Sequence, residues 1–346
     1  MKRRSLPLSY CAVLILLGLL LTERASFAAN PRIGVLIFDY TNNYVTYIRN
    51  SITQVAGDNA EILMIDAQND QAKQVEQVDT VISRGVDALA VNAVSPEAAP
   101  TIIEKARAAD LPIVFFNRSP SKEDMLSYEK CWYVGTTPYD SGRLSSEMAM
   151  AAFKADPKYD KNKDGVLQYL ILKGTPGHPD AEARTIAVQE TFAKAGFKAE
   201  LLDIQTGNFR TADAKDVTDA WIGRFGDKIE MILSNNDAML LGAVESLRGA
   251  GYLSADKPCG VIGINALPEV LTMIEDGTVI GSILSDAYSE GKNIFTMSYN
   301  AVKGQDVLTG VDGKLDDMKA LRVPYIPIDK SNIPLAQEVY KYALGK

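Results

Sequence analysis

The chain has 346 residues and a single histidine, which lies in the stretch GTPGHPDAEAR at 174–184. Pro179 suits the first turn of a helix, which places Asp180 near the helix N-terminus and Arg184 one turn later on the same face. A surface Asp–Arg pair at this spacing would add about 0.3 kcal/mol to helix stability and would leave His178 unexplained. A neutral imidazole, an acceptor carboxylate and a forked guanidinium would instead bind the hydroxyl groups of a ligand. The residues alone leave both interpretations open.

A second stretch, DKNKDGVLQ at 160–168, carries oxygen atoms at the spacing of a calcium-binding loop. The residues that provide them are Asp160, Asn162, Asp164, Val166 through its carbonyl, and Gln168, with Gly165 at the sharp turn. The twelfth position, which is a bidentate Glu in an EF-hand, is Ile171 inside a predicted strand. A cation would therefore need a carboxylate from elsewhere in the fold, and a solvated polar loop is the alternative interpretation.

Polar residues follow many of the predicted strands. They are Asn92, Asn117, Asn235, Asn236, Asn265 and Ser285. In open α/β sheets, ligands bind outside the carboxyl ends of the strands, so these residues favour a polar ligand at that edge. Asn and Ser also cap helices, but Asn117 is followed by a loop, so capping does not explain the whole set.

The elements that must position these residues alternate between strand and helix. After residue 30, continuous apolar strands such as 32–38 are followed by amphipathic helices such as 43–56. The series restarts near 136–140, and each later strand is followed by a predicted helix except the last, at 278–284. The pattern predicts an α/β fold of two doubly wound parallel-sheet lobes.

Composition narrows the class of protein. The net charge is −8 and no basic stripe is present, which argues against a nucleic-acid partner. There is no G-x-S-x-G, P-loop, G-x-G-x-x-G or H-E-x-x-H motif, so we expect a binding protein rather than an enzyme. Cys131 and Cys259 lie in apolar segments far apart in sequence, and we expect two separate buried thiols.

The first 28 residues have the pattern of a secretory signal peptide. A basic start, MKRR, precedes an apolar run at 8–21, and Ser26 and Ala28 occupy the small-residue positions before a cleavage site. The run is short for a membrane span, although an uncleaved anchor is the alternative. We expect cleavage after Ala28 and export to a bacterial periplasm.

Together these features resemble the periplasmic galactose/glucose-binding proteins of sugar ABC importers. The resemblance rests on DxNxDGxxQ, GxPGHPDAEAR, PIVFFNRSP, NNDAM and ALPEVL, and it covers essentially the whole mature chain. It implies the type I periplasmic binding protein fold, with hinge crossings near Thr136, Ser285 and Arg322. The implied parts are a signal peptide at 1–28, an N-terminal lobe at 29–136 plus 286–321, and a C-terminal lobe at 137–285 plus 322–346.

The resemblance also implies a sugar site and a calcium site. The sugar ligands that match the family by residue type are Asn117, His178, Asp180, Arg184 and Asn236, with Tyr44 and Phe209 as the aromatic pair around the ring. Asp180 would accept from the anomeric hydroxyl and Arg184 would donate to ring-side oxygens, while His178 and Asn117 would hold the exocyclic hydroxymethyl end. The calcium ligands would be Asp160, Asn162, Asp164, the Val166 carbonyl, Gln168 and, completing the cage, Glu230.

Three positions depart from the family pattern. Asn42 and Asn265 stand where the family has carboxylates, and Ser285 stands where it has Asn. A carboxylate only accepts, whereas an amide also donates, and charge-assisted bonds are the stronger kind. The changes should weaken or redirect hexose binding, so a differently substituted hexose, a pentose or a modified sugar are all admissible ligands.

The expected function is capture of a monosaccharide and its delivery to an ABC transporter permease, with a chemoreceptor as a further partner. A periplasmic sugar sensor that serves a receptor kinase or chemoreceptor, without transport, is the alternative. We expect a monomer. A sugar-responsive transcription regulator would need a DNA-reading head, and a signal peptide occupies that place.

Overall fold

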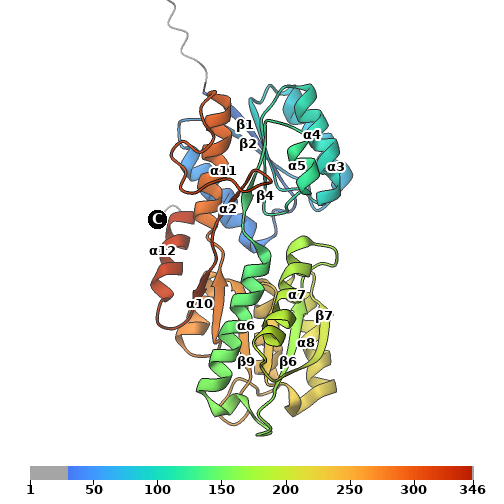
Figure 1. Cartoon of the computed structure of the whole chain (residues 1–346), viewed down its shortest axis with the longest axis vertical. Coiled ribbons are helices and arrows are strands. Elements are labelled where there is room, and N and C mark those ends of the chain that lie inside the picture. The colour runs from blue at the N-terminus through green and yellow to red at the C-terminus, as the bar shows by residue number, and fades with distance from the viewer. Residues whose placement is uncertain (1–29, 345–346) are drawn as a thin grey trace, which may run out of the picture. The chain divides into compact units, whose positions relative to one another are not determined.

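The strands lie in two sheets in the computed structural model, which describes residues 30–344 (Figure 1). The predicted signal peptide at 1–28 lies outside the described residues. Both sheets belong to one unit, Pro31–Lys346. In the described part of the chain, no helix is both long enough and apolar enough to cross a membrane.

The first sheet is parallel throughout, with strand order β11-β5-β4-β3-β1-β2. Its strands are β1 (Arg32–Ile37), β2 (Glu61–Asp66), β3 (Ala88–Val91), β4 (Ile113–Phe116), β5 (Cys131–Gly135) and β11 (Ala320–Arg322). Its helices are α2 (Asn43–Ala56), α3 (Gln71–Ser83), α4 (Ala99–Ala108), α5 (Lys122–Leu126) and α11 (Ala287–Val302). Because side chains alternate along a strand, Ile37 and Phe116 pack against α2 and α11, whereas Leu89 and Phe115 pack against α3 and α4. This sheet and its helices are called the first lobe.

The second sheet has the order β12-β10-β9-β8-β6-β7 and is parallel except for β12. Its strands are β6 (Leu167–Lys173), β7 (Ala199–Thr206), β8 (Met231–Ser234), β9 (Gly260–Asn265), β10 (Gly281–Leu284) and β12 (Ile326–Ile328). Its helices are α6 (Pro138–Ala155), α7 (Pro179–Lys194), α8 (Thr211–Phe225), α9 (Asp237–Gly249), α10 (Pro268–Glu275) and α12 (Ile333–Ala343). Ile171 and Met231 pack toward α6 and α7, and Leu172 and Ile232 pack toward α8 and α9. This sheet and its helices are called the second lobe.

The chain passes between the lobes three times. It crosses between β5 and α6, between β10 and α11, and between β11 and β12. The predicted α/β class with two doubly wound lobes is therefore confirmed, while the residue-level lobe boundaries stay predictions. One expectation was wrong: helix α11 follows the strand at 281–284. Its residues Asn293, Ser298 and Asn300 are polar although they are buried, which hides the apolar period in the sequence.

Helix α12 contacts both lobes. It packs on α10 in the second lobe and on α2 and α11 in the first (Figure 1). The Tyr340 ring meets Tyr47 of α2 edge to face, with centroids 4.6 Å apart. The Tyr340 hydroxyl donates to the backbone oxygen of Asn265 at 2.7 Å. This contact fixes the end of β9, where one of the predicted ligand residues lies.

The two cysteines within the described residues are separate buried thiols, as expected. Cys131 lies in the core between the first sheet and α3–α5, and Cys259 lies in the core of the second lobe. Burial raises the pKa of each thiol to about 12, so both stay protonated.

Candidate functional site

A cavity forms where the carboxyl ends of the strands of both sheets meet. Its lining consists of Phe38, Asn42, Tyr44, Asn117 and Arg118 from the first lobe, and His178, Asp180, Arg184, Phe209, Asn236 and Asn265 from the second. This set, called the inner cavity, contains every predicted sugar-binding residue except Ser285. Residues more than 200 positions apart in sequence therefore share one pocket, as expected for a topological switch point.

Two predicted residues lie at the edge of the second sheet. Asn265 ends β9 and has a φ of 121°, a backbone conformation that side-chain-bearing residues rarely adopt. Such strain is typical of ligand sites. Ser285 follows β10 and is 1 % exposed, but it does not line the inner cavity, so its contact with a ligand stays a prediction.

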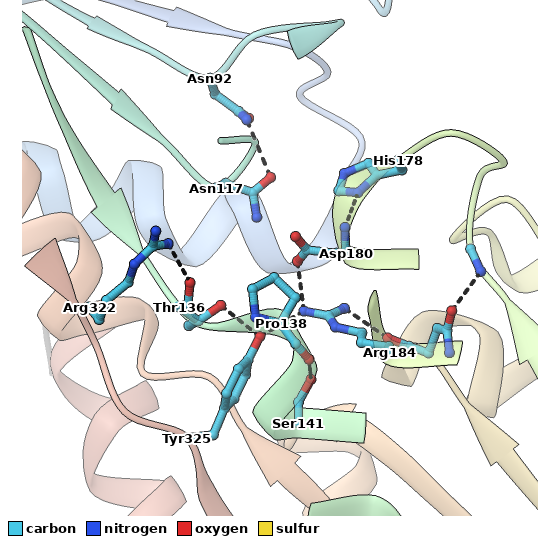
Figure 2. Close-up of polar contacts among 12 residues, drawn as sticks. Asn92, Asn117, Thr136, Pro138, Ser141, His178, Asp180, Arg184, Arg322 and Tyr325 are labelled. Atoms are coloured by element: carbon cyan, nitrogen blue, oxygen red, sulfur yellow. Dashed lines mark hydrogen bonds and ion pairs between the residues drawn. The ribbon is translucent and has the colours of Figure 1, made fainter. Parts of the chain in front are cut away.

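The start of α7 brings His178, Asp180 and Arg184 together at the inner cavity. His178 is the N-cap residue, and its Nδ1 accepts from the Asp180 backbone N–H at 3.1 Å (Figure 2). The Asp180 carboxylate and the Arg184 guanidinium are 2.8 Å apart, and both side chains are only 7 % exposed. The surface-pair interpretation is therefore wrong, because an exposed pair would not be desolvated in this way.

The His178 imidazole is neutral. Burial lowers its pKa to about 4, and the Arg118 and Arg184 charges oppose protonation further, against the attraction of Asp180. Because Nδ1 accepts a backbone hydrogen bond, the ring proton resides on Nε2. His178 therefore offers the cavity a hydrogen-bond donor without a charge.

The Arg184 guanidinium connects the cavity to the lobe crossings. It donates to the Asn235 backbone oxygen at 2.8 Å and to the Tyr325 hydroxyl at 2.9 Å. The Tyr325 hydroxyl shares a 2.7 Å hydrogen bond with Thr136 Oγ1, and Arg322 donates to the Thr136 backbone oxygen at 2.9 Å (Figure 2). Thr136 lies in the first crossing and Tyr325 in the third. A cavity residue is thus joined directly to two hinge segments.

Three cavity asparagines, Asn42, Asn117 and Asn236, are held through their side-chain oxygens. Asn42 caps α2 and Asn236 caps α9, each accepting from a backbone N–H at 3.0 Å. Asn92 Nδ2 donates to Asn117 Oδ1 and to the Phe116 backbone oxygen, at 3.3 Å each. The capping interpretation is correct for Asn236, and Asn42 is a cap as well; capping leaves their Nδ2 groups free to face a ligand.

Sequence reasoning did not single out Arg118, although it lies in the quoted stretch PIVFFNRSP. Arg118 is 8 % exposed, and its guanidinium stacks on Phe38 at 3.9 Å. Its partners are the backbone oxygens of Ala93 and Val94, and its Nε is buried without a partner. Burial lowers the pKa of Arg118 to about 10, which still leaves it charged near neutral pH. An Arg directly after a strand-end Asn was the available signal.

Aromatic residues of both lobes line the cavity. Phe209 has a φ of 59° and meets the His178 ring edge to face at 5.1 Å. Its ring packs so closely on Gly174 that a Cβ there would lie 2.1 Å away, so only glycine fits. Tyr44 is 8 % exposed and extends from the first turn of α2. The predicted ring sandwich between Tyr44 and Phe209 stays a prediction.

A buried acid lies behind Tyr44. Glu290 of α11 is 2 % exposed, and burial raises its pKa to about 8 despite the nearby Tyr44 hydroxyl and Arg184 charge. The Asp180 and Asp286 carboxylates raise this pKa further. Glu290 is therefore neutral near pH 7.

A wider mouth opens outside the inner cavity. It shares Phe38, Asn42, Arg118, His178 and Phe209 with the inner cavity. Its further charged side chains are Asp39, Glu97 and Arg210. Asp39 accepts from the Thr41 backbone and hydroxyl at 2.8 and 2.7 Å, so this carboxylate is engaged within its own turn.

The predicted cation loop precedes β6 at the far side of the second lobe. Gly165 has a φ of 71°, which allows the sharp turn. Asp164 Oδ2 accepts from Asn162 at 2.9 Å and from Gln168 at 3.0 Å, while the Val166 backbone donates to Asp164 Oδ1 at 2.7 Å. The Val166 backbone and the two amides lower the pKa of Asp164, so it is ionised.

Glu230 reaches this loop from the start of β8. Its two carboxylate oxygens accept from the Lys161 backbone at 2.7 Å and the Gln168 backbone at 2.9 Å. Asp160 Oδ1 is buried without a partner, and this orphaned oxygen fits a hard cation. No three Asp, Glu, His or Cys side chains among residues 30–344 are gathered closely enough to hold a metal ion as they stand. The donor types fit calcium, but the carboxylates and amides would have to draw together.

Two α/β lobes, three crossings and a polar cavity at the strand ends define a two-lobed solute-binding protein. A sequence profile described as a periplasmic binding protein domain matches residues 33–306, and the chain belongs to this family. It is a substrate-binding protein, and the family consists of binding proteins rather than enzymes.

Individual relatives agree with this assignment. The chain is 42 % identical to the D-galactose/methyl-galactoside binding periplasmic protein MglB of Haemophilus influenzae over 335 residues, which covers 96 % of this chain and 98 % of the relative. A putative rhizopine-binding protein of Rhizobium meliloti is 26 % identical, with 92 % of this chain and 96 % of the relative covered. An Actinobacillus succinogenes solute-binding protein with bound D-allose shares the fold, with a TM-score of 0.76 at 21 % identity, over 88 % of this chain and all of that chain.

Proposed function

We propose that this protein captures a monosaccharide in the periplasm, between its two lobes, and delivers it to an ABC permease. The observation that carries the proposal is the inner cavity, where hydrogen-bonding side chains from both lobes converge. A ligand that contacts both lobes stabilises the closed arrangement over the open one, since only the closed state makes both sets of contacts. The similarity to the galactoside-binding relative supports a sugar ligand.

Each side chain has a defined role in this proposal. Asp180 accepts from a ring hydroxyl with the carboxylate oxygen that Arg184 does not engage, and the amide nitrogens donate to ring oxygens. Phe209 and Tyr44 cover the apolar faces of the sugar. The binding requires no covalent chemistry, because the ligand is released unchanged to the permease.

Calcium belongs to the proposal as a structural ion. Asp160, Asn162, Asp164, the Val166 carbonyl, Gln168 and Glu230 would hold it, and it would link the loop to β8. The closed protein would act as a monomer, and its surface would also be presented to a chemoreceptor.

The direct test is calorimetry on the mature protein, residues 29–346, with calcium present, against a panel of neutral and charged monosaccharides. Binding of at least one monosaccharide supports the proposal, and Asp180→Asn should abolish it. Arg143→Gln is the matched control, because Arg143 is a partly exposed residue of α6 outside the cavity. Absence of heat with every monosaccharide would overturn the sugar-binding function.

A further inference from the structure

We infer that the ligand is a monosaccharide that carries a carboxylate, a sugar acid of the hexuronate type, and that Arg118 binds the carboxylate. This inference rests on the proposed function and specifies its ligand. The carrying observation is the polarity of the inner cavity, whose side chains present many donors and few acceptors.

Two of these donors follow from helix capping. Asn42 Oδ1 accepts from the Val45 backbone, and Asn236 Oδ1 accepts from the Met239 backbone. A backbone N–H can only donate, so the amide oxygens must face the helices and the Nδ2 groups must face the cavity. Both amides are therefore fixed as donors.

The same logic fixes Asn117 and His178. Asn92 Nδ2 is held in place by the Phe116 carbonyl, so the atom of Asn117 that faces it is the oxygen. Asn117 Nδ2 is turned away from Asn92, toward the side on which Asp180 lies (Figure 2). The His178 Nδ1 accepts a backbone hydrogen bond, so its Nε2–H is also a donor.

Acceptors are scarce in comparison. Among the residues that line the inner cavity, Asp180 has the only carboxylate, and one of its oxygens is engaged by Arg184. The Asn265 amide oxygen is a further candidate acceptor. Each hydroxyl of a neutral sugar has a proton to donate, and this cavity has few places to receive one. In a sugar acid, a carboxylate takes the place of a hydroxyl group. Its oxygens only accept hydrogen bonds, which suits a cavity lined mainly by donors.

The charges of the cavity lining also favour a ligand with a carboxylate. Arg118 and Arg184 are both buried in the lining, and the Asp180 carboxylate compensates only one of them. The Nε of each arginine is buried without a partner, but Arg184 also has the Tyr325 and Asn235 oxygens, whereas Arg118 has only backbone carbonyls and the Phe38 ring. A buried guanidinium without a direct ion-pair partner is costly, and a ligand carboxylate would reduce that cost.

The Asp180 and Asp39 carboxylates attract the Arg118 guanidinium, but its hydrogen bonds go to backbone oxygens and not to either acid. Glu290 lies behind Tyr44 and is protonated near neutral pH. Asp39 is held by its own turn, and it and Glu97 line the wider mouth rather than the inner cavity. The excess of one positive charge favours a single carboxylate over a doubly charged phosphate.

The experiment compares matched sugars by calorimetry on the mature, calcium-loaded protein: D-galacturonate with D-galactose, D-glucuronate with D-glucose, and D-galactose 6-phosphate as the phosphate arm. We expect at least one uronate to bind about 10-fold or more tightly than its neutral partner, as a charge-assisted bond would provide. Arg118→Gln should remove this preference, and Arg143→Gln should not.

A second variant covers the case in which Arg118→Gln fails to fold. Asn42→Asp keeps the helix cap, since Asp caps as well as Asn does, and adds an acceptor oxygen to the cavity. It should weaken uronate binding and strengthen neutral hexose binding. Tighter binding of the neutral sugars or the phosphate by the native protein would overturn the carboxylate assignment while leaving sugar capture intact. Binding of no sugar at all would overturn both.

Discussion

The inner cavity and the cation loop use Asp and Asn for opposite purposes. In the cavity, the oxygens of Asn42 and Asn236 are engaged by helix N-termini, so the amides are left as donors. In the loop, the Asn162 and Gln168 amides surround the ionised Asp164, and Asp160 retains an unpartnered oxygen. In our proposals, the first region receives acceptors from a ligand, and the second offers oxygens to a cation.

The two regions also hold acids in opposite states, one buried and one exposed. Glu290, behind the cavity, is kept neutral by burial, whereas backbone and amide donors keep Asp164 ionised. Two acidic residues therefore differ in charge, so residue type alone does not set the polarity of a site. The neighbouring backbone groups decide which atoms remain available.

The largest effect should come from breaking the buried ion pair of the cavity. Arg184→Met leaves the Asp180 carboxylate desolvated without its partner, so we expect a loss of about 3–5 kcal/mol in unfolding free energy and loss of ligand binding. Denaturant unfolding and calorimetry measure the two effects. Arg143→Gln controls for the loss of a charge, and an Arg184→Met loss below about 1 kcal/mol would show that the pair is not desolvated as described.

The residues of the cation loop could be predicted from the sequence more fully than those of the cavity. The loop is contiguous in sequence, so the spacing of its residues predicts every donor except Glu230, which lies far along the chain, directly before β8. The cavity is assembled from loops far apart in the chain, and its residues were placed largely by resemblance. Arg118 was missed because an arginine after a strand is ordinarily solvated. Its burial arises only when Phe38, the residue after β1, packs against it.

Two other residues needed the tertiary structure. Glu290 lies in α11, a helix that the pattern did not predict, and its burial depends on packing between α11 and α2. Tyr325 lies in a short crossing without periodicity, and its role appears only because Arg184 and Thr136 meet its hydroxyl. The alternation of strands and helices and the two doubly wound sheets, in contrast, follow from local pattern and were predicted correctly apart from α11.

The contrast between the two acids can be tested by pH. The folded-state pKa of Glu290 is raised to about 8 from 4.5, so the folded protein binds more protons than the unfolded chain between these values. Stability should therefore fall as pH rises from about 4.5 to about 8. Glu290→Gln mimics the neutral acid and should be more stable than the native protein by about 3 kcal/mol near pH 7, with the gap closing toward low pH.

Unfolding curves at several pH values measure the Glu290 effect. Glu245→Gln, at an exposed position of α9, is the matched control and should follow the native pH profile. A constant difference between native protein and Glu290→Gln at every pH would mean that Glu290 does not titrate in this window.

Removal of calcium with a chelator tests whether the cation loop binds a metal ion. If calcium binds the loop and is present at about 100 times its dissociation constant, a chelator should lower the free energy of unfolding by about 2.7 kcal/mol. Asp160→Asn, which replaces the unpartnered oxygen, should reduce this response to chelator. Sugar affinity should change little, because the loop and the inner cavity share no residues. An unchanged melting temperature with chelator would show that the loop is a solvated polar turn.

The smallest expected effect concerns the connection from the cavity to the hinge. Tyr325→Phe removes the hydroxyl that joins Arg184 to Thr136, while the ring remains. Loss of this hydrogen-bond network should cost about 1 kcal/mol and weaken ligand binding about 5-fold, since the hydroxyl supports the closed arrangement. Calorimetry with the bound sugar measures the change, and Tyr342→Phe, at an exposed tyrosine of α12, is the control. Equal affinities for native protein and Tyr325→Phe would confine the hydroxyl to a local packing role, and the cavity would then close without help from the crossings.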